Sequence, residues 1–108
     1  MSRMHNPPHP GEILSGLYIE PSGLTISEVA RNIGVDRKTL SRVVNAHASI
    51  TVEMAIRLAK AFNTTPELWL NAQQSYDLWY VEQSGRVNVS KILMFRSGEK
   101  NTKRLSHI

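Results

Sequence analysis

The stretch TISEVARNIGVDRKTLSRVVNAH, residues 25–47, decides the fold of this chain. Thr25 and Glu28 have the spacing of a capping box, in which each side chain bonds the backbone N–H of the other residue, so a helix begins there. Gly34 ends that helix, because the residue after a helix usually needs a positive φ that glycine tolerates best. Asp36 is placed to cap a second helix. Apolar residues recur at helical spacing in both segments, first Val29, Ala30 and Ile33, then Leu40, Val43 and Val44.

The second helix of this pair has a polar and basic outer face. Its side chains are Arg37, Lys38, Ser41, Arg42 and Asn45. A helix with one aliphatic stripe and one face of arginines and amides, placed after a tight turn, suits the major groove of DNA. Small Ala30 at the helix crossing, Gly34 at the turn and inward Leu40 have the spacing of a helix-turn-helix. An ordinary helical hairpin with a solvated charged face is the alternative.

The outer face defines a set of expected DNA contacts. The arginines can bond guanine O6 and N7, and Asn45 can bond adenine N6 and N7. Thr39 and Ser27 are candidates for phosphate contacts, because Ser27 lies near a helix N-terminus whose backbone N–H groups point outward. The predicted DNA-binding residues are Ser27, Arg37, Lys38, Thr39, Ser41, Arg42 and Asn45. Tight binding would need a homodimer that reads two half-sites about one DNA turn apart.

Length and composition indicate one globular domain. The chain has 108 residues, of which 41% are hydrophobic. No apolar run approaches the roughly 20 residues that span a bilayer, and the N-terminus lacks the apolar segment of a signal peptide. Cysteine is absent, which excludes disulfides and thiolate metal sites and fits a reducing cytoplasm. We therefore expect a cytoplasmic protein.

The formal charge of +4 is concentrated near the C-terminus. Residues 1–84 hold seven Lys and Arg against eight acids, a net charge of −1, whereas residues 85–108 hold six against Glu99 alone, a net charge of +5. The basic tail therefore explains the high isoelectric point of the chain. Of the seven basic residues within 1–84, three lie in the six residues from Arg37 to Arg42. This local concentration of positive charge is a better argument for DNA binding than the net charge of the chain.

A first helix is predicted to begin at Pro10, which suits the first position of a helix. Residues 21–23, Pro-Ser-Gly, should stop it. Its apolar residues Ile13, Leu14 and Leu17 are expected on one face. Before it, His5 and His9 are four residues apart, but the intervening prolines forbid a helix, so a solvated lead-in is expected rather than a metal site.

Two more helices are predicted after residue 50. Thr51 begins one, on which Arg57 and Lys60 are expected to face water. The last runs from about Pro66 to Gln83, and it carries four aromatic residues, Trp69, Tyr76, Trp79 and Tyr80. Such a group indicates core packing or a subunit interface. We expect Trp69 in the core, and we expect Tyr76, Trp79 and Tyr80 at a dimer interface.

The pattern changes after Ser84. Residues 87–90 alternate and residues 92–95 are apolar, which indicates either an isolated strand or a segment that orders only against another chain. Residues 97–108 are expected to form a mobile basic tail. The predicted organisation is a lead-in over 1–8, a helix-turn-helix domain over 9–84 and a basic tail over 85–108.

The sequence gives no support for an enzyme. It has no GxSxG, no phosphate-binding glycine loop and no HExxH. The eight carboxylates within residues 1–84 are scattered along the sequence, so no general acid–base pair is indicated. We expect no catalytic residues, no cofactor and no metal.

Several segments together resemble the HigA (VapI-type) antitoxins, small proteins of the lambda-repressor-like (Xre) helix-turn-helix class. They are HPGEIL at 9–14, IEPSGL at 19–24, SRVVNAHASIT at 41–51 and EMAIRLAKAFNTTPELWLNAQQSYDLW at 53–79. The resemblance covers about residues 7–82 and weakens after Glu82. It implies an all-α, five-helix lambda-repressor-like DNA-binding domain, with a short C-terminal extension that is a strand or disordered, and a DNA-reading helix over Asp36–His47.

The resemblance also implies a role. Such a protein would be the antitoxin of a bacterial type II toxin–antitoxin pair, repress its own operon as a dimer and neutralise a HigB-like toxin, a ribosome-dependent mRNA endonuclease. The alternative is a stand-alone repressor of the same fold without a toxin partner.

Overall fold

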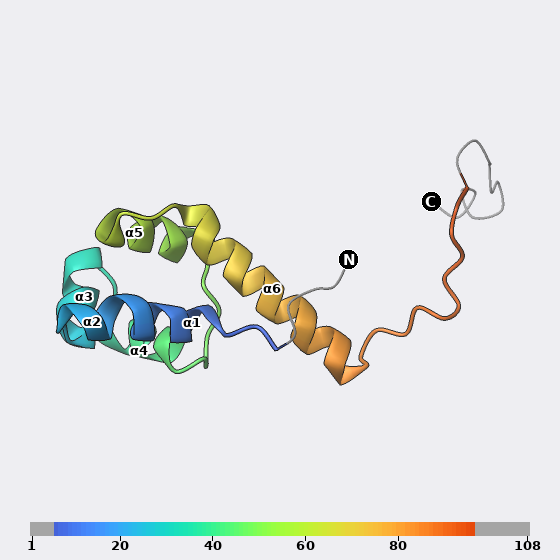
Figure 1. Cartoon of the computed structure of the whole chain (residues 1–108), viewed down its shortest axis with the longest axis horizontal. Coiled ribbons are helices and arrows are strands. Elements are labelled where there is room, and N and C mark those ends of the chain that lie inside the picture. The colour runs from blue at the N-terminus through green and yellow to red at the C-terminus, as the bar shows by residue number, and fades with distance from the viewer. Residues whose placement is uncertain (1–5, 97–108) are drawn as a thin grey trace.

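The computed structural model describes residues 6–96, which form helices and contain no strand (Figure 1). The first helix is continuous through α1 (Pro10–Ile13), the π-helical segment η1 (Leu14–Ile19) and α2 (Glu20–Ser22). Four helices follow, α3 (Ile26–Ile33), α4 (Arg37–Val44), α5 (Val52–Phe62) and α6 (Pro66–Ser84). The predicted all-α architecture of five helices is confirmed.

The first four of these helices form a compact cluster, and α6 runs from α5 past α1 until its second half leaves the cluster (Figure 1). The core joins all the helices, because α3 contributes the buried Val29, Ala30 and Ile33 and the other helices contribute the largest fully buried side chains. They are Leu14 of η1, Leu40 and Val43 of α4, Leu58 of α5 and Trp69 of α6. The expectation that Trp69 is a core residue is confirmed.

The π-helical segment changes which side of the first helix faces the core. The Glu20 N–H bonds the carbonyl oxygen of Ser15, five residues back, so the turn is wider than in an α-helix. The apolar face is therefore carried by Ile19, which is buried, while Leu17 is 68% exposed. The prediction that Leu17 shares the inner face is wrong, because the extra residue in the turn rotates it outward.

Pro21 lies inside this helix. A proline ring crowds the carbonyl oxygen four residues back in a regular α-helix, here that of Leu17. The widened turn directly precedes Pro21, so the helix passes the proline with the wider π-helical spacing in place of a regular α-helical turn. The helix ends at the next residue, Ser22, and Gly23 follows as its C-cap with a φ of 74°, so the prediction that the helix stops within residues 21–23 is confirmed.

The predicted signals around α3 and α4 are largely present. Both hydrogen bonds of the capping box between Thr25 and Glu28 are made, and Gly34 has a φ of 79°. Asp36 occupies the N-cap position of α4 but makes no side-chain capping hydrogen bond. The DNA-reading helix is shorter than predicted. It ends at Val44, because Ala46 adopts a φ of 62° and reverses the chain.

Gly11 is the closest approach between the first helix and α4. A Cβ atom at this position would collide with the backbone carbonyl group of Val43 and crowd that of Val44. Only a residue without a side chain allows α1 to lie this near the end of α4. Gly16, in the same helix, has open space where its side chain would be.

Replacing Gly11 with alanine should therefore destabilise the fold by about 1–3 kcal/mol, because the new methyl group must push two backbones apart. The matched control is Gly16→Ala, which should leave stability unchanged or raise it by up to about 1 kcal/mol through better helix propensity. Thermal melts followed by circular dichroism measure both. Equal melting temperatures for the two variants would contradict the close packing.

After α6, residues 86–96 form no strand, and a turn at residues 90–91 is closed by a hydrogen bond from the N–H of Ile92 to the carbonyl oxygen of Val89. The apolar side chains of this segment are exposed: Val87, Val89, Ile92, Leu93, Met94 and Phe95. The alternative of an isolated strand is therefore not observed within the described residues. The other alternative, a segment that orders only against another chain, stays a prediction. The expected mobile tail, 97–108, lies outside the described residues. Among residues 6–96, no helix is long and apolar enough to cross a membrane.

Candidate nucleic-acid interface

The two helices of the predicted helix-turn-helix are fixed by their apolar sides. Ala30 is 2% exposed where α3 meets α4, and it leaves room for Leu40, which is completely buried. Val43 is covered as well, on the side of α4 that contacts α1. These contacts set the rotation of α4, and therefore they decide which of its side chains remain in solvent.

The opposite side of α4 is open to solvent. Its exposed side chains are Arg37, Lys38, Thr39 and Arg42, and Ser41 is half-buried beside them. With 3.6 residues per turn, Arg37, Lys38, Ser41 and Arg42 share one face of the helix, and Thr39 lies at the edge of that face. Three positive charges on two turns give a local positive potential that favours a polyanion such as DNA.

Arg37 links the starts of the two helices. Its Nε donates a hydrogen bond of 2.9 Å to the Oγ of Ser27 in the first turn of α3. Two of the predicted DNA-binding residues, one for bases and one for phosphate, are thus neighbours in space although they are ten residues apart. The N-termini of α3 and α4 consequently lie near each other on one surface of the molecule.

The far end of α4 departs from the prediction. Asn45 is the C-cap residue and lies at the edge of the helix, and its Nδ2 donates to the backbone oxygen of Ser41 at 2.9 Å. Arg42 donates from Nη2 to the backbone oxygen of His47 at 3.0 Å, which ties it to the turn that follows. Arg42 keeps further N–H donors, and Asn45 keeps its acceptor Oδ1, for contacts with bases.

Arg57 is a structural residue that the sequence pattern placed in solvent. Its Nη1 donates a hydrogen bond of 2.6 Å to the backbone oxygen of Ile33, and its Nη2 pairs with Glu53 at 3.0 Å. The prediction that Arg57 faces water holds only in part, because 38% of its side chain is exposed while the guanidinium group bonds to Ile33 and Glu53. The guanidinium group satisfies a carbonyl group at the end of α3 and so holds α5 against the turn at Gly34.

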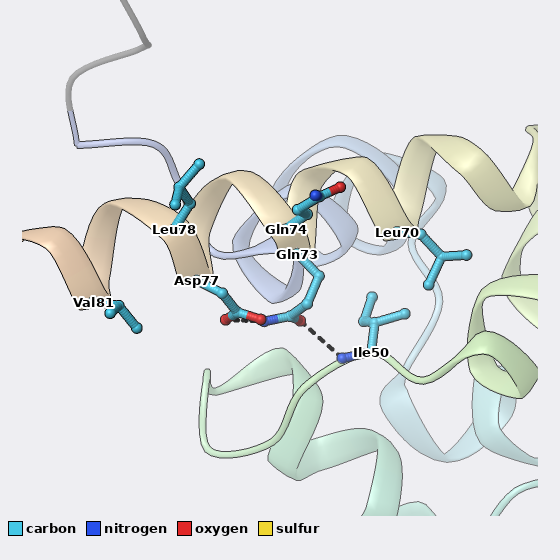
Figure 2. A pocket seen from close by; sticks show the side chains of 7 residues that line it. All are labelled: Ile50, Leu70, Gln73, Gln74, Asp77, Leu78 and Val81. Carbon is cyan, nitrogen blue, oxygen red and sulfur yellow. Dashed lines mark hydrogen bonds between the residues drawn. The ribbon is translucent and has the colours of Figure 1, made fainter. Parts of the chain in front are cut away.

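Gln73 is a second buried polar residue that the sequence did not reveal. Its Oε1 accepts a hydrogen bond of 2.8 Å from the N–H of Ile50, and its Nε2 donates to Asp77 at 2.9 Å (Figure 2). Ile50 belongs to the connection that follows α4, so Gln73 fastens that connection to α6. Glutamine is usually exposed, and the sequence carries no signal for this role.

An apolar groove of about 480 Å³ lies beside this bond. Its walls are Ile50 on one side and the side chains of α6 on the other, with Gln73 and Asp77 between them (Figure 2). The residues contributed by α6 are Leu70, Gln73, Gln74, Asp77, Leu78 and Val81.

The aromatic residues near the end of α6 are partly covered by their own chain. Tyr76 meets the ring of His9 edge to face at 4.9 Å and lies nearly parallel to Tyr80 at 6.1 Å. Tyr80 is 52% exposed. The Nε1 of Trp79 is buried and has no hydrogen-bond partner within residues 6–96.

His9 is not part of a solvated lead-in. It is 4% exposed, and its Nδ1 accepts a hydrogen bond of 2.9 Å from the N–H of Gly11, so it caps α1. Burial lowers the pKa of His9, an effect that the nearby carboxylates of Asp77 and Glu12 oppose. The described residues contain no group of three His, Asp or Glu side chains that could hold a metal ion. His5 lies outside the described residues.

The chain matches known proteins over most of its length. The helix-turn-helix family model matches residues 17–69. An uncharacterized HTH-type transcriptional regulator of Haemophilus influenzae is 49% identical over 80 residues, 74% of this chain and 75% of the relative. Antitoxin HigA-1 of Vibrio cholerae is 44% identical over 69 residues, 64% of this chain and 65% of the relative. The solved structure of antitoxin GraA in complex with its operator has a TM-score of 0.77 and 31% identity, covering 91% of this chain and 98% of that one.

Proposed function

Because the chain belongs to the Xre-type helix-turn-helix family that includes the HigA antitoxins, we propose that it is an antitoxin of a type II toxin–antitoxin system and an autorepressor. In this role it binds operator DNA as a homodimer and neutralises a HigB-like mRNA endonuclease. DNA is its target, so it acts in the cytoplasm. The observation that carries the proposal is the exposed basic face of α4 beside the start of α3.

DNA binding uses α4 as the recognition helix. Arg37, Lys38, Ser41, Arg42 and Asn45 face the major groove, and Ser27 and Thr39 contact phosphates. The bond between Arg37 and Ser27 supports this assignment, because it joins a base-reading side chain to a helix start that favours phosphate. The similarity to a protein solved with its operator supports the same surface.

Replacing Arg42 with alanine should weaken binding to duplex DNA from upstream of the protein's own gene by roughly 1–3 kcal/mol and relax its sequence preference. Arg37→Ala should do the same, since it also removes the link to Ser27. Fluorescence anisotropy with the duplex and with a scrambled duplex measures both effects. Lys60→Ala is the control, because Lys60 is an exposed cation on α5, outside the two motif helices. Unchanged affinity in both arginine variants would contradict the proposal.

Dimer formation uses the projecting end of α6, with Tyr76, Trp79 and Tyr80 in the contact. Support comes from the ring of Tyr80, which is 52% exposed near the end of α6. Tyr76 contributes less area, since part of its ring covers His9. The groove lined by Leu78 is the adjacent apolar surface of the same helix.

Tyr80→Glu should convert the dimer to a monomer, because a carboxylate in an apolar interface loses its hydration without gaining a partner. Light scattering after size-exclusion chromatography gives the mass. Ser75→Glu is the control, since Ser75 is an exposed residue of α6 that lines neither the aromatic end nor the groove. If Tyr80→Glu stays dimeric and Leu78→Glu becomes monomeric, the subunits meet across the groove and the aromatic assignment is wrong.

The toxin partner distinguishes the two candidate roles. Several relatives are named only as regulators, among them the Haemophilus influenzae protein, and this favours a stand-alone repressor as the second candidate. The predicted division is a lead-in over 1–8, a domain over 9–84 and a basic tail over 85–108. It places the exposed apolar side chains of Val87, Val89, Ile92, Leu93 and Met94 outside the domain, where a partner chain can reach them.

Expression of the tagged chain together with its neighbouring gene tests the antitoxin role. We expect a small untagged protein to co-elute with it, and that protein alone should stop growth and cleave mRNA. Truncation after Gly85 is the companion variant, and it should retain DNA binding and dimerisation. A harmless neighbouring gene product that does not co-elute would leave the stand-alone repressor as the function.

A further inference from the structure

We propose that His9 is a positioning residue for DNA recognition. It couples the position of α6 to the position of the end of the recognition helix α4, and its protonation weakens operator binding. The inference deepens the proposed function and rests on it for the part that concerns DNA. It depends on three contacts that meet at one buried side chain.

The first two contacts hold the imidazole ring from opposite sides. The ring of Tyr76, on α6, meets it edge to face at a centroid distance of 4.9 Å and an interplanar angle of 78°. The Nδ1 atom accepts a hydrogen bond of 2.9 Å from the N–H of Gly11, in the first turn of α1. With His9 only 4% exposed, the ring cannot move without disturbing both helices.

The third contact belongs to Gly11 itself. This glycine lies so close to α4 that a Cβ atom would collide with the carbonyl group of Val43. The residue that donates to His9 is therefore also the residue that contacts the end of the recognition helix. Tyr76, His9, Gly11 and Val43 form a continuous path of packed groups from α6 to α4.

This path requires a neutral imidazole. An Nδ1 that carries a proton becomes a donor, and it would then face the N–H of Gly11 and the positive end of a helix dipole. Asp77 of α6 and Glu12 of α1 are the carboxylates that act on His9, and Tyr76 is the other titratable group against it. Their attraction for a positive charge is weaker than the effect of burial, so the pKa of His9 is lowered.

The direction of the pH effect follows from linkage. Because the pKa is lower in the folded protein than in the unfolded chain, the unfolded chain binds more protons between the two values. The contribution of His9 is complete above its ordinary pKa of about 6.5 and is lost as the pH falls below it. Acidification should therefore loosen the start of α1, release the end of α4 and weaken the complex with DNA.

The experiment compares the wild-type chain with His9→Asn at pH 7.5 and pH 5.5. Asparagine places its Oδ1 near the position of Nδ1, is a favourable N-cap residue and does not titrate in this range. Both proteins keep His47, so any pH effect of that exposed residue cancels in the comparison. The probe is the duplex from upstream of the protein's own gene, and circular dichroism confirms at each pH that the chain is folded.

We expect the wild-type affinity to fall relative to that of His9→Asn when the pH is lowered to 5.5, with equal affinities at pH 7.5. His9→Ala lacks the hydrogen-bond acceptor, so its affinity for the duplex should be low at both pH 7.5 and pH 5.5. Because asparagine restores the acceptor, a higher affinity of His9→Asn shows that the hydrogen bond matters and not packing alone. Identical pH profiles for the wild-type chain and His9→Asn would overturn the proposal.

A measurement without DNA separates this proposal from the proposed function. In an NMR titration of the wild-type chain, the amide signals of Val43 and Val44 should follow the same midpoint as the His9 ring, and they should stay constant in His9→Asn. If they do so while no duplex is bound, the DNA-binding function fails and the coupling stands. If they do not follow His9, the coupling itself is refuted.

Discussion

The structure depends on the burial of one side of α4. Leu40 and Val43 are removed from water by α3 and by the first helix, and an eight-residue helix is too short to be stable without such packing. The same contacts fix the rotation of the helix about its axis. The basic side of α4 is thus exposed because its aliphatic side is buried. The stability of the fold and the exposure of the proposed DNA-binding surface therefore have one origin.

The last helix has two roles along its length. Its first half completes the core through Trp69, whose indole Nε1 donates to the hydroxyl of Thr64 at 2.8 Å, and through the bond from Gln73 to the connection after α4. Its second half extends beyond the cluster and carries Trp79 and Tyr80 (Figure 1). In the proposed dimer, this projecting half of α6 sets the separation of the two recognition helices, on which half-site spacing depends.

Sequence patterns succeeded where the cause is local and failed where it is not. The capping box at Thr25 and the positive φ at Gly34 follow from interactions within a few residues, and both are present. Leu17 was misplaced because a helix of constant period cannot represent the widened turn before Pro21. Residue type favours water for Arg57, and the surrounding prolines favour a solvated lead-in for His9. In the fold, Arg57 bonds the carbonyl group of Ile33, which is distant in sequence, and His9 is covered by Tyr76 of α6.

The sequence by itself determined the number of helices, the turn at Gly34 and the division of α4 into an aliphatic and a basic side, since these depend on spacing along the chain. Only the tertiary structure decided that Arg37 lies against Ser27, that Gln73 is buried and that Gly11 gives α1 access to the end of α4. The reason is physical. Spacing fixes which side chains share a helix face, but the partner of that face is chosen by packing among residues that are distant in sequence.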